Sequence, residues 1–266
     1  MTQTHSEIDF YMPVQVDASP IQIKFPLSPS RMNLFFPCPR KFYYNELHLR
    51  KIEEKWKARA RGIMVHKVIA EYFRLVRSDP SKMEIRNLIF EIFDEKWAFK
   101  QIYGEEDYIK QCLNNFSDMD ASRVRVDGSD YLPTFVEQEF VTDEYHGFID
   151  WYNKETGVIR DWKTSKSPYM NQDMQRQGAI YKTILEANNY PVNTVIFEML
   201  YPGKSKILPI QEENYLENEL TKITTAAGLG NFRKVPTGLC AYCPYQLRCE
   251  AEPISLWSEF DLEYYL

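Results

Sequence analysis

The sequence predicts an α/β (α+β) protein in which a mixed sheet of about five strands is flanked by helices. One observation behind this prediction is a meander, in which apolar-rich runs follow one another with short turn-forming stretches between them. A second is the change to helical periodicity after the meander and again after two further strand-like runs. The expected strands are 134–142, 146–152, 158–163, 192–201 and 205–211, and the expected helices among them are 171–188 and 212–228.

Helical periodicity also dominates the chain before the meander. Apolar residues recur with the helical period along three stretches, namely 60–77, 82–103 and 105–119. Near the start, Ser28 and Pro29 are typical of a helix N-cap and of the first helical position. Because Cys38 stands between two prolines, this early helix is expected to break there and resume.

The centre of the chain is a predicted β-hairpin whose strands carry charged side chains among apolar ones. Asp161 and Lys163 are two apart, so they project from one face of a strand while Trp162 points to the other. Asp150 lies on the partner strand. Folding the chain back about the turn at 153–157 sets Asp150 opposite Asp161 to within about a residue, where cross-strand Cβ atoms are ~5 Å apart. Two carboxylates and an ammonium are therefore expected to share one patch.

The two carboxylates of this patch need a counter-charge, because they repel each other unless one is protonated or a cation lies between them. A divalent metal suits the patch best, since Mg²⁺ and Mn²⁺ prefer hard oxygen ligands and also bind phosphate oxygens. Lys163 would then orient the attacking water or help to deprotonate it. The residues therefore indicate a phosphodiester-cleaving site with Asp150, Asp161 and Lys163 as its catalytic groups.

Four short motifs resemble those of the RecB-type PD-(D/E)xK nucleases. GFID at 147–150 matches GxxD, DWK at 161–163 matches DxK, and QGAIY at 177–181 matches QxxxY. GIMVH at 62–66 supplies the helical histidine that precedes the sheet in that family, with a glycine expected to let the helix approach the sheet closely. Order and spacing agree over about 120 residues, which is far more specific than any one motif. The resemblance implies a restriction-endonuclease-like core.

The same resemblance assigns a metal site. It implies that His66, Asp150, Asp161 and the main-chain carbonyl of Trp162 bind Mg²⁺ or Mn²⁺, with Lys163 as the catalytic lysine. The imidazole ligand shifts the preference toward Mn²⁺. The expected function is a metal-dependent DNA exonuclease that acts on single-stranded ends. The alternative is a non-catalytic DNA-binding or scaffold subunit, which loss of a catalytic residue would mark, but all four motifs are intact.

Two regions are expected to contact DNA. Gln177 and Tyr181 are four apart on one helix face, and the resemblance places this face against DNA, although an amide and a phenol could equally satisfy polar edges. The stretch from residue 40 to residue 61 has eight basic and three acidic side chains. Cations interleaved with aromatic rings are typical of a single-strand path, so the expected contacts there are Arg40, Lys41 and Trp56. A solvated helix covering an aromatic core would have the same composition.

Cysteines are concentrated near the C-terminus. Cys240, Cys243 and Cys249 form a CxxCx₅C pattern, and Cys38 stands far upstream. Four thiolates hold one soft centre well, and ligand count does not separate structural zinc from a [4Fe–4S] cluster. Disulfides are not expected in a cytoplasmic chain with this spacing. Cys112 lies within an expected helix and is interpreted as a small buried residue.

An early cysteine with a late CxxCx₅C and a short tail resembles the iron–sulfur nucleases of CRISPR adaptation, exonuclease V and AddB-type subunits. This resemblance implies a [4Fe–4S] cluster held by Cys38, Cys240, Cys243 and Cys249. Such a cluster would close a long loop and tie the two ends of the chain around the nuclease core. DNA, proteins of a CRISPR-adaptation or repair complex, and further copies of the chain are the candidate partners.

Composition sets bounds on these expectations. A chain of 266 residues with 44% apolar content suffices for one large globular unit. No run reaches the ~20 apolar residues that span a bilayer, and the start lacks the order of a signal peptide, so a cytoplasmic location is expected. A net charge of −6 requires that DNA binding come from local clusters. The expected segments are an arm (1–26), a helical segment with Cys38 (27–59), the nuclease core (60–230) and an iron–sulfur segment (231–266).

Overall fold

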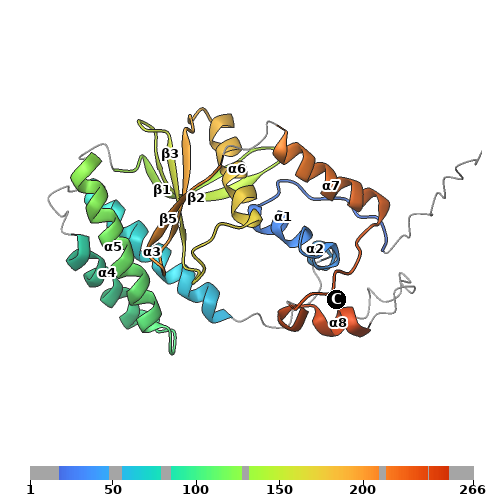
Figure 1. Cartoon of the computed structure of the whole chain (residues 1–266), viewed down its shortest axis with the longest axis horizontal. Coiled ribbons are helices and arrows are strands. Elements are labelled where there is room, and N and C mark those ends of the chain that lie inside the picture. Colours follow the sequence, from blue (N-terminus) through green and yellow to red (C-terminus); the bar gives the residue numbers. More distant parts are fainter. Residues whose placement is uncertain are drawn as a thin grey trace, which may run out of the picture.

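A five-stranded mixed sheet forms the middle layer of the computed structural model (Figure 1). The structure describes residues 18–47, 56–78, 85–127, 132–209, 214–238 and 240–251, with only the backbone described at 56, 77, 78, 124–127 and 251. The strands are β1 (Phe135–Val141), β2 (His146–Asn153), β3 (Val158–Lys163), β4 (Thr194–Met199) and β5 (Lys204–Ile207). The predicted fold class is confirmed.

The strands lie in sequence order across the sheet. Antiparallel pairing joins β1 to β2, β2 to β3 and β4 to β5. β3 and β4 are parallel, and the crossover between them is the helix α6 (Gln172–Ala187). This connection returns over one face of the sheet, so the side chains of α6 lie above the hairpin of β2 and β3.

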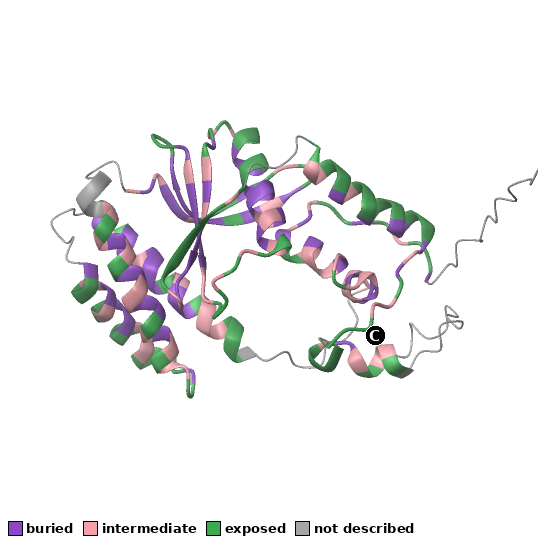
Figure 2. Ribbon diagram, in the orientation of Figure 1, coloured by how far each residue is buried: buried purple, intermediate pink, exposed green. Residues whose placement is uncertain are grey.

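Three helices cover the other face of the sheet: α3 (Trp56–Ser78), α4 (Ile85–Phe99) and α5 (Glu106–Asp127). Large aromatic side chains fill this layer. Trp162 of β3 stacks on Phe73 of α3 with ring centroids 6.0 Å apart, and its edge meets Phe116 of α5. Figure 2 shows buried residues along the sheet and on the inner sides of these helices. The packing of Trp162 fixes α3 against the middle of the sheet.

The face under α6 is also covered by α1 (Pro29–Phe35), α2 (Pro39–Glu46) and α7 (Tyr215–Leu229). As predicted, the Ser28 side chain accepts a hydrogen bond from the Arg31 backbone N–H, and Pro29 begins α1. The helix also breaks at Cys38 as predicted, because α2 begins afresh at Pro39.

The C-terminal segment packs against α2. Ring contacts join Tyr43 to Phe232 (4.8 Å between centroids) and Tyr44 to Tyr245 (5.4 Å). The C-terminal part consists of the 3-10 turn η3 (Cys240–Tyr242) and the helix α8 (Gln246–Ala251). Aromatic packing thus holds the C-terminal segment against the N-terminal helices.

Element ends differ from the prediction where tertiary contacts intervene. α5 continues to Asp127 rather than residue 119, because Arg123 reaches the buried Glu198 of β4 at 2.8 Å. β5 ends early at Ile207, before Pro209, whose nitrogen cannot donate to a sheet. The predicted extension of α4 before Ile85 lies outside the described residues. Within the described ranges, no helix combines the length and hydropathy needed to cross a bilayer.

Candidate active site

The β2–β3 hairpin opens at the point where its carboxylates lie. The two strands pair from Asn153↔Val158 to Trp151↔Arg160, and one more step in this register would bring Asp150 opposite Asp161. Instead, the Trp162 backbone N–H donates to Asp150 Oδ2 at 2.7 Å. A side chain therefore takes the place of a backbone acceptor, and both aspartates face the gap. The register agrees with the predicted pairing.

The alternation of side chains between the two faces of the sheet is interrupted in both β1 and β2 next to this gap. Phe135 and Phe140, five apart on β1, lie in the same core with ring centroids 4.8 Å apart, which strict alternation would not allow. Glu137 between them has a φ of +46° and lies opposite Asp150 in the register. On β2, Ile149 packs under α6 whereas Trp151 packs on the α3 side. The double switch turns Glu137 and Asp150 toward α3.

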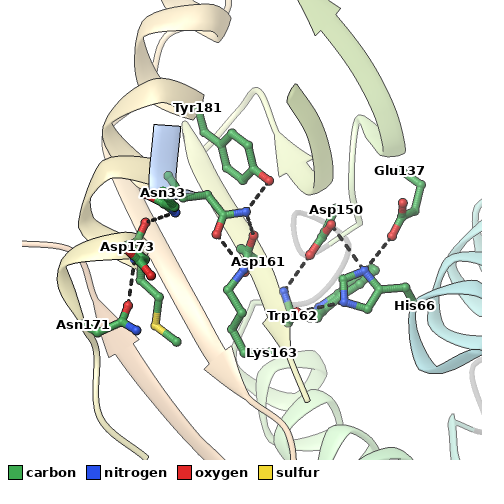
Figure 3. A network of polar contacts seen from close by, with 12 residues as sticks. Asn33, His66, Glu137, Asp150, Asp161, Trp162, Lys163, Asn171, Asp173 and Tyr181 are labelled. Carbon is green, nitrogen blue, oxygen red and sulfur yellow. Dashed lines mark hydrogen bonds and ion pairs between the residues drawn. The ribbon is translucent and has the colours of Figure 1, made fainter. Parts of the chain in front are cut away.

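His66 of α3 joins these groups (Figure 3). Its Nδ1 lies 2.9 Å from Glu137 Oε1 and 3.5 Å from Asp150 Oδ1, and its Nε2 lies 2.8 Å from the carbonyl oxygen of Trp162. A carbonyl only accepts, so Nε2 carries a proton here. Burial lowers the pKa of His66, but the charges of Asp150 and Glu137 outweigh it and raise the pKa well above 6.5. The imidazolium is the cation nearest these two acids.

Lys163 and Asp161 form the second half of the site, on the side of α6. Lys163 Nζ lies 2.5 Å from Asp161 Oδ2 and donates to Gln177 Oε1 at 2.7 Å. The Gln177 amide donates to Asp161 Oδ1 at 3.1 Å and to the Tyr181 hydroxyl at 2.6 Å. Burial raises the pKa of Asp161 to about 6; Lys163 acts to lower it and Asp150 to raise it. The carboxylate, ammonium and amide hold one another in place (Figure 3).

A glycine makes room for this network. A Cβ at Gly147 would lie 2.9 Å from Cε1 of Tyr181, closer than real side chains approach, so only glycine lets the phenol pass over β2 to reach Gln177. The expected role of Gly62 is wrong. A Cβ there would meet only Thr164 Oγ1 at 3.5 Å, an ordinary contact, so α3 does not need glycine to approach the sheet.

The donor set fits a divalent metal. Ligand atoms of His66, Glu137 and Asp150 all lie within 4.8 Å of one another, and this is the one such group of His, Cys, Asp and Glu side chains among the described residues. The separations of 2.9 Å and 3.5 Å from His66 Nδ1 to the Glu137 and Asp150 oxygens match the ~3 Å edges of an octahedron with metal–oxygen bonds of ~2.1 Å. The Trp162 carbonyl lies at the other ring nitrogen, Nε2, and so outside this group. Buried carboxylates facing one another also call for a cation. Mg²⁺ or Mn²⁺ satisfies both requirements.

The structure therefore brings most of the predicted site together. His66 contacts both Asp150 and the Trp162 carbonyl. Asp161, the residue before Trp162, is outside this group and is bound by Lys163 and Gln177. Glu137 was missed, because no motif marks it. The register of β1 against β2 was the signal that would have found it, since it places Glu137 opposite Asp150.

The predicted DNA contacts fare differently. Arg40 is only 2% exposed, and its guanidinium lies by the rings of Tyr43 and Tyr44, so it does not present its charge to a nucleic acid. Gln177 and Tyr181 are engaged by the network above, which is the protein-internal role left open by the sequence. Lys41 is half-buried, and the side chain of Trp56 lies outside the described residues.

The cysteines lie in two settings. Cys112 is fully buried in α5, as predicted, and burial raises its pKa to about 12. Burial raises the pKa of Cys249, Lys234 acts to lower it, and Cys38 and Cys243 raise it further, so these three cysteines lie within electrostatic reach of one another. Cys240 is exposed, and its sulfur accepts from the Thr237 N–H at 3.3 Å. No three of the cysteine sulfurs, all within the described ranges, come within 4.8 Å of one another.

An open hairpin with two aspartates, a lysine and a histidine on an adjoining helix is the arrangement of a metal-dependent nuclease. The family model of the PD-(D/E)XK nuclease superfamily matches residues 26–250. The chain belongs to this superfamily. A comparison with curated proteins finds no significant match.

The glycine in β2 gives a direct test of the network. Gly147→Ala should push the Tyr181 ring away from Gln177 and lower the free energy of unfolding by about 1–3 kcal/mol, as overpacking does. Thermal and denaturant unfolding measure this. Gly62→Ala is the matched control and should leave stability unchanged or raise it slightly, because a helix interior favours alanine. Equal losses in the two variants would contradict the crowding at Gly147.

Proposed function

We propose that this chain is a RecB-type, divalent-metal-dependent DNA exonuclease that hydrolyses phosphodiester bonds at single-stranded ends. The observation that carries the proposal is the gap in the β2–β3 hairpin, where Asp150 lies beside His66 and Asp161 lies beside Lys163. Carboxylates for a metal and an ammonium for a nucleophile then lie within one small volume, as phosphodiester hydrolysis requires.

The residues that would hold Mg²⁺ or Mn²⁺ are His66 through Nδ1, Glu137 and Asp150, with Asp161 as the further carboxylate. The carbonyl oxygen of Trp162, which accepts a hydrogen bond from His66 Nε2 here, would join them only if the imidazole turned away from it. The bound ion would supply charge for the phosphate oxygens and lower the pKa of a water. Holding it requires a neutral imidazole and ionised carboxyls, so His66 must release the proton on Nδ1, the nitrogen that faces Glu137 and Asp150.

Lys163 has the role of positioning the nucleophile. The Gln177 carbonyl oxygen and Asp161 fix its ammonium from two sides, so its direction is set before substrate arrives. The ammonium can then donate to the attacking oxygen and stabilise negative charge that develops on the phosphate. Tyr181 stays protonated, because burial raises its pKa well above 10, and it supports Gln177 from behind.

The catalytic assignment predicts a loss of cleavage without a loss of fold. Asp150→Asn and Lys163→Ala should each reduce cleavage of end-labelled DNA in Mg²⁺ or Mn²⁺ by at least ~100-fold, the scale of losing an electrostatic or acid–base group. Glu155→Gln, in the exposed turn of the same hairpin, is the matched control and should cleave normally.

Near wild-type cleavage by a pure Lys163→Ala sample would sink the site assignment. A wild-type protein that binds DNA but cleaves neither single-stranded nor duplex substrate with either metal would instead support the scaffold alternative.

The proposed function also predicts a substrate preference. A free single-stranded 5′ or 3′ end should be degraded much faster than a blunt duplex, and binding should weaken steeply as salt rises. The support is the exposed basic start of α3, where Lys57 and Arg59 precede His66. Time courses on labelled single strands, blunt duplexes and closed circles measure the preference. Equal rates on closed circles would point to an endonuclease.

We also propose that Cys38, Cys240, Cys243 and Cys249 bind a [4Fe–4S] cluster. Support comes from the nearness of Cys38, at the N-cap of α2, to Cys243 and Cys249 near the other end of the chain, since Cys38 and Cys243 both act on the pKa of Cys249. Cys243 and Cys240 stand one 3-10 turn apart, a local arrangement that lets both sulfurs turn to one side. The bound cluster would tie α2 to the C-terminal segment, where the aromatic contacts already lie.

Iron content tests the cluster. Anaerobically purified protein should absorb broadly near ~400 nm and contain about four irons per chain. Cys38→Ser should lose iron as fully as Cys243→Ser despite their separation in sequence, because each removes one of four ligands. Cys112→Ser is the control and should keep the colour, since that thiol is buried in α5. A colourless protein holding one zinc would overturn the iron assignment and leave a four-thiolate site.

A further inference from the structure

A groove runs along α3 from the active site. Its larger part is a hollow of about 560 Å³ that has His66 and Glu137 in its lining, together with side chains of α3 and α4. A smaller hollow of about 210 Å³ extends toward the start of α3 and the end of α4, and the two share Ile63 and Lys67. α3 and α4 pack against each other, so both helices contribute walls to the larger hollow. The groove is therefore continuous with the proposed metal site at one point and open along a helix.

Basic side chains dominate the walls of the groove. They come from α3, from α4 and from the residue after it: Arg59, Lys67, Arg74, Lys96 and Lys100. Among the lining residues that the structure describes, the one acid is Glu137, which contacts His66. Within the described ranges, Arg74 has a long contact of 3.4 Å with the half-buried Glu71, and the charged ends of the other four side chains have no hydrogen bond or ion pair. In a chain of net charge −6, such a cluster creates a local positive potential.

The spacing of the cations suits a linear polyanion. At 100° per residue, positions 59, 63, 67, 70 and 74 fall within an arc of about 80°, so they form one stripe along α3. The rise of ~1.5 Å per residue makes the stripe ~22 Å long, about the length of six nucleotides at ~3.4 Å per nucleotide of a strand. Ile63 lies between Arg59 and Lys67 and is 44% exposed, which offers an apolar surface to a base or a sugar.

We propose that this groove binds the phosphodiester backbone of one DNA strand and leads it to the site at His66 and Asp150. The direction of the path rests on the proposed function, because a scissile phosphate must lie at the site, but strand binding itself does not require cleavage. Phosphates pair with the cations of α3 and Lys96 of α4, and the apolar floor takes unstacked bases. The strand therefore passes over α3 rather than over α6, where Gln177 and Tyr181 face inward.

Neutralising the groove tests this path. The triple variant Lys67→Ala/Arg74→Ala/Lys96→Ala should bind a fluorescent single-stranded oligonucleotide at least ~10-fold more weakly in low salt with a chelator present. The slope of log K against log salt should fall by about two, at ~0.7 for each lost phosphate contact. The three side chains are exposed or half-exposed, so unfolding curves should stay close to those of the wild type.

The matched control removes the same charge elsewhere. Lys24, Lys154 and Lys206 are exposed, and they lie before α1, in the hairpin turn and on the edge strand β5, away from the groove. Lys24→Ala/Lys154→Ala/Lys206→Ala should keep the wild-type salt slope. Equal affinities and slopes in the two triple variants would overturn the groove, as would an equal loss of affinity for blunt duplex and for single strand.

The two proposals fail separately in this design. A wild-type protein that binds the oligonucleotide through the groove but cleaves nothing in Mg²⁺ or Mn²⁺ would retain the strand path and refute the nuclease assignment. A groove variant that binds and cleaves like the wild type would refute the path and leave the nuclease assignment intact.

Discussion

The hydrogen bond from the Trp162 backbone N–H to the Asp150 carboxylate is the interaction on which the site depends. In an uninterrupted hairpin that N–H would bond to a backbone carbonyl of β2, and the two aspartates would be crowded in a closed ladder. Because a side chain accepts the bond instead, the strands part and the Trp162 carbonyl remains available to His66. Burial raises the pKa of Asp161, Lys163 lowers it, and the Asp150 carboxylate that this bond holds nearby raises it further. Two carboxylates this close make the site a receptor for cations.

The other face of the sheet sets the position of the histidine. Alternation along β3 sends Asp161 and Lys163 toward α6 and sends Trp162 into the layer under α3, where it stacks on Phe73. This aromatic contact therefore sets the position of α3 relative to the sheet. His66, two turns before Phe73, reaches the carbonyl of the same Trp162. One residue of β3 thus positions the helix with its side chain and binds the helix's histidine with its backbone.

What the sequence could predict follows from the range of the interactions involved. The common face of Asp161 and Lys163 depends only on the period of a strand, and the approach of Asp150 depends only on a short turn, so both could be predicted locally. His66 lies 2.8 Å from an atom 96 residues away, and only the resemblance to known motifs indicated its role. Glu137 was missed because a positive φ breaks the alternation at that residue, so only the register of β1 against β2, and not the period of the strand, places it beside Asp150. Arg40 was misread because its burial depends on Phe232 and Tyr245, which pack on its neighbours from the far end of the chain.

The groove proposed to bind DNA is positively charged, and the adjoining active site is negatively charged. The groove along α3 attracts a phosphate backbone, whereas Glu137, Asp150 and Asp161 repel one as long as no metal neutralises them. His66 compensates only part of that negative charge, and it must give up its proton when a metal binds. A strand can therefore rest on the basic stripe without a metal, but its phosphate can approach the carboxylates only after a divalent cation has bound. His66 belongs to the proposed metal site and Lys67 to the groove, so the two regions adjoin at successive residues of α3. Because a strand in the groove already lies next to the carboxylates, a bound metal decides whether that strand is also a substrate.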